Sequence, residues 1–189
     1  MQITRIVERT VPIASKMRNA VVDFSQMTAS AVAVVTDVVR EGEPIVGYGF
    51  NSNGRYGQGG ILRDRIIPRL ERADAADLIG SGRGNFDPHA AWRVMMRNEK
   101  PGGHGDRSVA VGTIDMALWD IVAKIEERPL YQVLADRFAD GESNAKVEVY
   151  AAGGYYHPDR DVDALKAELA SYRERGYQTV KMKVGGAEI

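Results

Sequence analysis

Residues 179–184 (TVKMKV) close a strand–helix–strand pattern that starts at residues 146–154 (KVEVYAAGG). Between them, residues 162–175 have the apolar spacing of an amphipathic helix, and Gly176 follows as its expected C-terminal cap. The inward face of this helix is expected to carry Val162, Leu165, Leu169 and Tyr172. Because two consecutive strands joined by a helix run parallel, this stretch predicts one βαβ unit, the repeating element of a β/α barrel.

Two lysines stand two residues apart in the second of these strands. Side chains alternate along a strand, so Lys181 and Lys183 share one face, and Val180, Met182 and Val184 share the other. In a barrel, the apolar face would pack on the surrounding helices, and the lysines would point inward near the mouth that holds the active site. Two ammonium groups held so close repel each other, which favours a neutral amine that can act as a general base. An edge strand with a solvated lysine face is the alternative interpretation.

The composition indicates a folded domain that acts on small molecules. The chain has 189 residues, 44% of them hydrophobic, and a formal net charge of -1, so no basic surface for nucleic acid is expected. No apolar run approaches the length of a membrane span. The absence of cysteine excludes disulfides and thiolate metal sites, and without an apolar leader segment the expected location is the cytoplasm. The three histidines are far apart and show no metal-ligand spacing, which predicts surface or packing roles for His89, His104 and His157.

The N-terminal part of the chain reads as strands followed by helices. Residues 3–13, 31–39 and 44–50 are rich in β-forming side chains, and residues 41–43 form a turn between the last two, which predicts an antiparallel meander. Helical periodicity begins at about Ile61. Its clearest stripe contains Ile114, Ala117, Leu118, Ile121, Val122 and Ile125, and a second helix is predicted over residues 130–138, after the break at Pro129.

A small α+β domain followed by a barrel strand ending in Lys-x-Lys resembles the enolase superfamily, in its mandelate racemase and muconate lactonising branch. Residues 109–134, with GTIDMALWDIVAKI and RPLYQVL, are similar to the signature helix of that branch and the segment after it. Four loops are similar to those of the D-tartrate dehydratases within the branch: RNAVVDFSQMT (18–28), GYGFNSNGRYGQGG (47–60), NEKPGGHG (98–105) and VYAAGGYY (149–156).

The resemblance covers the whole chain and implies its domain organisation. Residues 1–140 would form the α+β N-terminal capping domain, with a three-stranded antiparallel meander and a helical bundle. Residues 141–189 would form the first βαβ unit of an incomplete modified TIM barrel, truncated after its second strand. Such a chain on its own is expected to be catalytically inactive and prone to associate, because its strand edges lack partners.

The resemblance also implies roles for individual residues. Lys183 would be the base that removes the proton α to a substrate carboxylate, and Lys181 would hold the substrate. Asn19 and Asn53 fall on positions that resemble substrate-contacting residues of the family, and two further candidate substrate contacts, Lys100 and Tyr155, lie in loops similar to those of the family.

Each of these four positions also has a plain structural alternative. Asn19 and Asn53 suit a polyhydroxy diacid because an amide both donates and accepts hydrogen bonds. The alternative for both is a purely structural role, because asparagine is a common turn residue. Lys100 could pair with the distal carboxylate of the substrate, or it could be an ordinary surface lysine. Tyr155 could donate a phenolic hydrogen bond, or it could serve only in packing.

The implied reaction is a Mg²⁺-dependent dehydration of a hydroxy diacid or acid sugar, such as tartrate to oxaloacetate and water. Mg²⁺ would stabilise the enediolate that forms when the α proton leaves. Its acidic ligands and the acid histidine are expected on strands beyond Ile189, so no metal ligand is expected in this chain. The resemblance further implies a homo-oligomer at full length. Another dehydratase or racemase of the same branch, or a non-catalytic cap that complements a partner chain, are the alternatives.

Overall fold

The computed structural model describes residues 1–52, 54–80, 84–102 and 105–186 of the chain. The chain divides into two compact units. The first consists of Met1–Val11 and Thr28–Ser143, and the second of Pro12–Met27 and Asn144–Ile189. The segment 12–27 therefore belongs with the C-terminal part of the chain, which its position in the sequence does not suggest.

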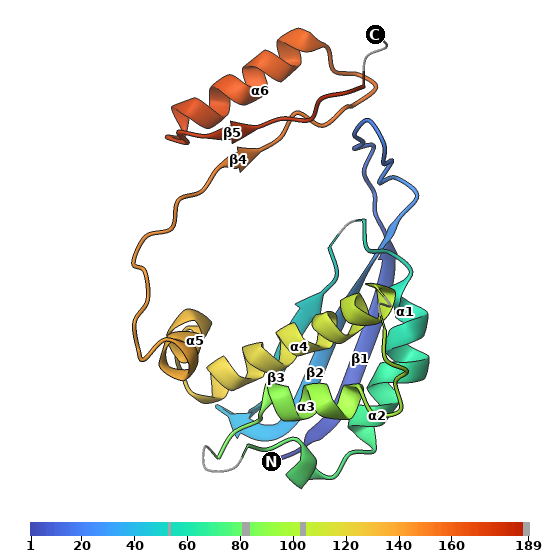
Figure 1. The fold of residues 1–189 in the computed structure, drawn as a ribbon, viewed down its shortest axis with the longest axis vertical. Helices are drawn as coiled ribbons and strands as arrows, with labels where there is room; N and C mark the ends of the chain where they lie inside the picture. The colour runs from blue at the N-terminus through green and yellow to red at the C-terminus, as the bar shows by residue number, and fades with distance from the viewer. Residues whose placement is uncertain (53, 81–83, 103–104, 187–189) are drawn as a thin grey trace. The chain divides into compact units, whose positions relative to one another are not determined.

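The first unit contains a three-stranded sheet in the order β1 (Ile3–Pro12), β2 (Thr28–Arg40) and β3 (Glu43–Phe50) (Figure 1). The hairpin between β2 and β3 turns through Glu41 and Gly42, which have φ angles of 52° and 85°. Two adjacent residues with positive φ form the type of tight turn whose twist matches that of paired strands. The predicted antiparallel meander is confirmed.

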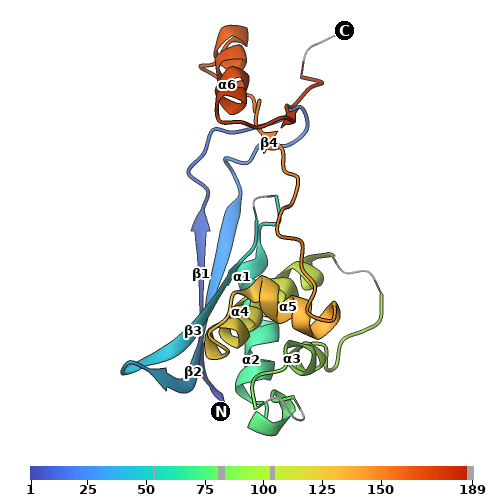
Figure 2. The ribbon, with the colours of Figure 1, turned by 90° about the vertical axis from the view of Figure 1, so that its left-hand side faces the viewer.

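The helices of this unit lie on one side of the sheet (Figure 2). They are α1 (Gln58–Ile61), the π-helical turn η1 (Leu62–Ile66), α2 (Ile67–Glu71), the 3₁₀ turn η2 (Ala75–Asp77), α3 (Pro88–Met95), α4 (Gly105–Ile125) and α5 (Leu130–Phe138). Helix α5 has the predicted bounds. The predicted stripe of α4 forms the centre of the core, where Ile114, Ala117, Leu118, Ile121 and Val122 are completely buried.

Helix α4 packs directly on the backbone of β3. A Cβ atom added to Gly47 would lie 2.0 Å from the main-chain oxygen of Ala117, and one added to Gly49 would lie 2.0 Å from the main-chain oxygen of Thr113. Any side chain at either position would therefore separate the helix from the strand. The two glycines allow the close approach that buries the apolar stripe of α4.

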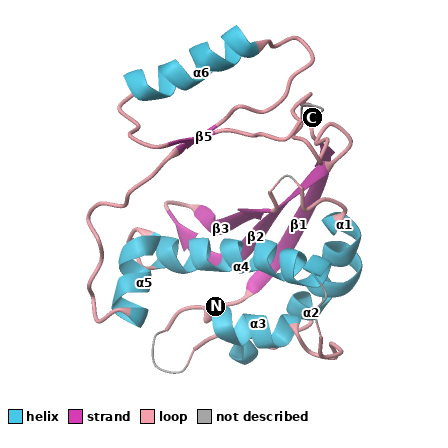
Figure 3. Ribbon diagram, turned by 45° about the horizontal axis from the view of Figure 1, so that its top comes forward, coloured by secondary structure: helices cyan, strands magenta, loops and turns pink. Residues whose placement is uncertain are grey.

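The second unit contains the predicted βαβ unit. Strands β4 (Ala151–Ala152) and β5 (Val180–Lys181) are parallel neighbours (Figure 1). Helix α6 (Val162–Glu174), drawn in cyan in Figure 3, connects them. The last helical residue of α6 is Glu174, and the predicted cap Gly176 closes the helix with a φ of 92°. Its N–H donates to Arg173 O at 2.9 Å and the next residue, Tyr177, donates to Tyr172 O at 3.2 Å, which is the Schellman pattern.

Three details of this unit differ from the sequence-based expectation. The strands are two residues long rather than nine and six, since β4 and β5 pair only through Ala151–Ala152 and Val180–Lys181 within the described residues. Val162 was predicted to face inward but is 65% exposed. Met182 and Val184 were predicted to pack under helices, yet they are 43% and 70% exposed. A two-stranded sheet offers too little surface to cover these side chains.

Candidate active site

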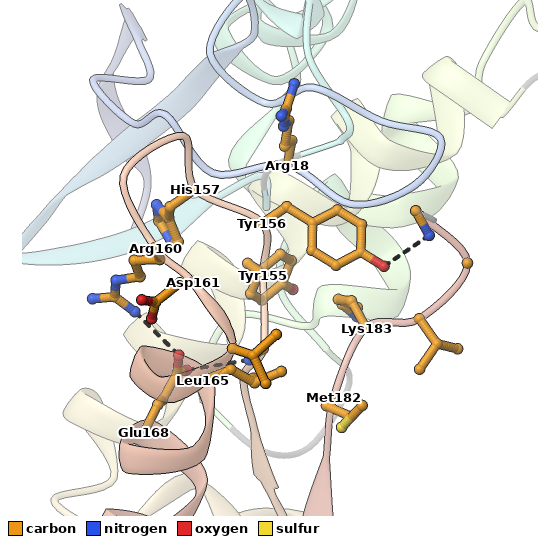
Figure 4. A pocket seen from close by; sticks show the side chains of 15 residues that line it. Arg18, Tyr155, Tyr156, His157, Arg160, Asp161, Leu165, Glu168, Met182 and Lys183 are labelled. Carbon is orange, nitrogen blue, oxygen red and sulfur yellow. Dashed lines mark hydrogen bonds and ion pairs between the residues drawn. The ribbon is translucent and has the colours of Figure 1, made fainter. Parts of the chain in front are cut away.

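A cavity of about 560 Å³ lies in the second unit, at the ends of the two parallel strands (Figure 4). Four segments line it: the loop 12–27, the residues after β4, the start of α6 and the residues after β5. The lining residues are Arg18, Gly154, Tyr155, Tyr156, His157, Arg160, Asp161, Val162, Leu165, Glu168, Met182, Lys183, Val184, Gly185 and Gly186. Ligand sites occur at this end of parallel strands because the connecting loops converge there.

The loop 12–27 is joined to the cavity wall through backbone hydrogen bonds. Arg18 N donates to Tyr156 O at 3.2 Å, and Tyr156 N donates to Arg18 O at 2.9 Å. The next residue, Asn19, closes a turn, because its Oδ1 accepts hydrogen bonds from Val21 N and Val22 N, both at 2.8 Å. Asn19 therefore has the turn role that was the structural alternative to substrate contact.

Lys183 and Tyr155 come together on one wall of this cavity. The Nζ atom of Lys183 lies 4.8 Å from the centre of the Tyr155 ring, over its face (Figure 4). The same ring makes an edge contact with Phe24, with centroids 6.1 Å apart and planes inclined by 77°. Lys183, the predicted base, and Tyr155, a predicted substrate contact, are thus neighbours in space, although they are 28 positions apart in the sequence.

Glu168 on α6 holds the turn that precedes Tyr155. Its Oε1 accepts from Tyr172 OH at 2.7 Å and from Gly154 N at 3.2 Å, and its Oε2 accepts from Arg160 Nη1 at 3.1 Å. The hydrogen bond from Tyr172 is the main reason that the pKa of Glu168 is lowered. A Cβ atom on Gly153 would lie 2.3 Å from Glu168 Oε1, so a larger residue there would require the Glu168 side chain to shift.

Sequence reasoning did not identify Glu168 as part of the site. The spacing of Glu168 and Tyr172, four residues apart on one helix, was a usable signal, because such residues face each other. The adjacent pair Gly153 and Gly154 was a second signal, since Gly154 has a φ of 64°.

Among the described residues, the predicted substrate contacts Lys181 and Lys100 do not line the cavity. Lys181 lies on β5, where its main-chain oxygen accepts from Gly153 N at 2.9 Å, and its side chain is exposed. Lys100 is exposed in the first unit, and its main-chain oxygen accepts from Arg107 Nη1 at 2.9 Å. Asn53 lies outside the described residues.

The described residues do not fit a magnesium ion. Across residues 1–52, 54–80, 84–102 and 105–186, no three histidine, aspartate or glutamate side chains are grouped so that they could hold a metal. We therefore assign no metal ligand to this part of the chain.

Within the described residues, no helix combines the length and the apolar character needed to cross a membrane.

Comparison with known proteins identifies the family. Residues 6–135 match the family "Mandelate racemase / muconate lactonizing enzyme, N-terminal domain", which is more than half of the chain. Arabinonate dehydratase from Saccharolobus solfataricus is 36% identical over 88 residues, covering 45% of this chain and 22% of that protein. L-talarate/galactarate dehydratase from Salmonella typhimurium is 29% identical over 177 residues, covering 93% of this chain and 41% of that protein.

A solved structure shows the same fold. It is an enolase from Bradyrhizobium complexed with magnesium and mandelic acid, with a TM-score of 0.65 and 22% identity, covering 99% of this chain and 46% of that one. The chain thus spans less than half the length of each of these three proteins. The matched N-terminal domain family and the three-stranded sheet of the first unit agree with each other. The chain belongs to the mandelate racemase/muconate lactonizing enzyme family of the enolase superfamily.

Proposed function

We propose that this chain is the base-carrying part of an acid-sugar dehydratase, in which Lys183 removes the proton α to a substrate carboxylate. The observation that carries the proposal is the position of Lys183 on the wall of a 560 Å³ cavity at the ends of two parallel strands. A cavity of this volume is within the range of small-molecule sites. Its similarity to arabinonate and galactarate dehydratases supports the choice of reaction.

The proposed reaction is an elimination of water. The lone pair on neutral Lys183 Nζ takes the α proton, and the electrons of the broken C–H bond form an enediolate. The β-hydroxyl then leaves with a proton as water, and the resulting enol becomes a 2-oxo acid. Within this class we propose a hydroxy diacid substrate, with tartrate and its product oxaloacetate as the first pair to test.

The remaining predicted contacts are part of the same proposal. We propose that Lys181, Lys100 and Asn53 contact the carboxylate and hydroxyl groups of the substrate. Tyr155 would contact the substrate through its hydroxyl. Asn19 would do so through its amide nitrogen, because its amide oxygen already accepts the hydrogen bonds of the turn. The proposed cofactor is Mg²⁺.

We also propose a domain boundary between the cap and the barrel near residue 140. The proposed assembly is a homo-oligomer, which light scattering can check.

The test is exchange of the substrate α proton with deuterium, catalysed by the complete gene product in D₂O with and without magnesium. Tartrate and the sugar acids of the relatives form the substrate panel. The variant Lys183→Ala should lose exchange and dehydration together. The matched control is Lys166→Ala, because Lys166 is an exposed lysine of the same unit whose Nζ pairs with Asp163.

Each outcome assigns the reaction. Exchange that persists in Lys183→Ala would remove Lys183 as the base. Exchange accompanied by inversion at the α carbon, without loss of water, would identify a racemase instead of a dehydratase.

A further inference from the structure

The ammonium group of Lys183 rests on an aromatic ring and makes no ion pair with a described residue. Its Nζ lies 4.8 Å from the centre of the Tyr155 ring. Among the described residues, no carboxylate oxygen lies within 4.0 Å of it. A lysine side chain has four rotatable bonds, so a partner is needed to hold its amine in one place. The ring face supplies that partner in both protonation states. Its negative quadrupole attracts the ammonium form, and the same face keeps van der Waals contact with the side chain when the amine is neutral.

The Tyr155 ring is itself fixed by a residue from the distant loop. Phe24 is only 8% exposed and meets the Tyr155 ring edge to face. Such aromatic pairs prefer this inclined geometry over a parallel sandwich. The loop in turn fixes Phe24, because Phe24 N donates to Met17 O and Phe24 O accepts from Met27 N, both at 3.2 Å.

The backbone beside Tyr155 is fixed on both sides. Gly154 N donates to Glu168 Oε1 at 3.2 Å, and Tyr156 exchanges two main-chain hydrogen bonds with Arg18. Tyr156 OH also accepts from Gly186 N at 3.0 Å, which ties the segment after β5 to the same place. Lys183 and Tyr155 are therefore held on two segments that are bonded to each other.

We infer that Tyr155 is the positioning residue of Lys183, acting through the face of its ring, and that Phe24 supports the ring through its edge contact. This inference rests on the proposed role of Lys183 as the base. The hydroxyl of Tyr155 is not needed for this role, which separates it from the phenolic hydrogen bond to substrate. Phenylalanine should therefore replace Tyr155 in positioning Lys183, whereas leucine should not.

The direct test is NMR of the lysine side chains in the complete protein, labelled with ¹³C at the ε carbon. Protons above a ring face are shifted upfield, so the Lys183 ε protons should be displaced from the other lysines, and Lys183→Arg assigns the signal. The displacement should persist in Tyr155→Phe, disappear in Tyr155→Leu and shrink in Phe24→Leu. The matched control is Tyr150→Leu, since Tyr150 is a 55% exposed tyrosine of the same segment.

A kinetic test separates positioning from substrate binding. Tyr155→Leu should lower kcat roughly tenfold, a factor within the range of measured cation–π contacts. Tyr155→Phe should restore kcat, and any loss of a hydroxyl contact with substrate should then appear in KM alone. A Lys183 signal without displacement in the unmodified protein, or one that keeps its displacement in Tyr155→Leu with a native amide spectrum, would overturn the inference.

The two proposals fail in different ways. If Lys183→Ala keeps α-proton exchange while the ring displacement is present, the base assignment fails and the contact stands as a structural one. If Lys183→Ala loses exchange while the displacement is absent, the base assignment stands and the positioning role of Tyr155 fails.

Discussion

Lys124 donates a hydrogen bond from Nζ to the main-chain oxygen of Val46 at 2.7 Å, and this contact caps the outer edge of β3 from helix α4. The same edge is capped again where Asp120 Oδ2 accepts from Tyr48 N at 3.0 Å. Lys124 and Asp120 are also ion-paired with each other at 2.7 Å. An exposed edge strand offers unpaired backbone groups to other chains, so the two side chains protect β3 from such pairing.

The double variant Asp120→Ala/Lys124→Ala should form larger assemblies than the unmodified protein at the same concentration. It frees two backbone groups of β3 and loses two hydrogen bonds of about 1 kcal/mol each. Sedimentation velocity over a concentration series measures the effect. The matched control is Asp163→Ala/Lys166→Ala, which removes an ion pair on α6 that touches no strand edge. Equal association of both double variants would show that the edge caps are not the cause.

Gly47→Ala and Gly49→Ala should each destabilise the first unit by about 1–3 kcal/mol. In both, the new methyl group would lie 2.0 Å from a main-chain oxygen of α4, so helix and strand must move apart and the core beneath them opens. Urea unfolding measures the loss. Gly112→Ala is the control, since Gly112 also belongs to α4 but a Cβ there meets nothing within 4 Å. Alanine at Gly112 should be neutral or stabilising by up to about 1 kcal/mol.

The features that sequence alone predicts are those set by local interactions. The turn at Gly42, the buried stripe of α4 and the cap at Gly176 each depend on residues a few positions apart. Period, turn type and capping chemistry are local, so they can be read before any tertiary contact is known.

The features that sequence does not predict depend on distant contacts. Gly47 and Gly49 read as ordinary strand glycines until α4 is placed against them. Phe24 reads as one apolar residue of a polar loop until its ring meets Tyr155. The exposed Val162 shows the reverse effect, because an apolar helical spacing does not by itself supply a surface to cover it.

Tyr172→Phe should raise the pKa of Glu168. The hydrogen bond from Tyr172 OH stabilises the charged carboxylate, and it is the largest of the interactions that lower this pKa. Titration of the Glu168 side chain by ¹³C NMR measures the shift. Gly154 N and Arg160 still bond the carboxylate in the variant, so the shift should be partial. A pKa that does not change would mean that Tyr172 does not bond Glu168 in solution. Tyr177→Phe is the control.

A buried carboxylate ties together the helical part of the first unit. The side chain of Glu99 is only 1% exposed and pairs with three arginines, Arg65, Arg69 and Arg107, from η1, α2 and α4. Arg107 also donates to the main-chain oxygens of Lys100 and Gly102, both at 2.9 Å. The hydrogen bond from Arg65 is the main reason that the pKa of Glu99 falls from 4.5 to about 2.

This carboxylate predicts a loss of stability in acid. Because the folded pKa lies below the unfolded one, the contribution of Glu99 is complete above pH 4.5 and is lost as the pH falls towards 2. The shift corresponds to about 3 kcal/mol. Glu99→Gln should therefore be less stable than the unmodified protein by about that amount at pH 6, and the difference should shrink as the pH falls through this window. Urea unfolding at pH 6, 4 and 3 measures it.

The matched control for this pH dependence is Glu127→Gln. The Glu127 side chain is 69% exposed and pairs with Arg40 at 3.0 Å, so it is screened by water and should contribute less than about 1 kcal/mol. Its difference from the unmodified protein should be small at every pH. A Glu99→Gln difference that stays constant from pH 6 to pH 3 would show that packing, rather than the charge shared with the three arginines, makes Glu99 stabilising.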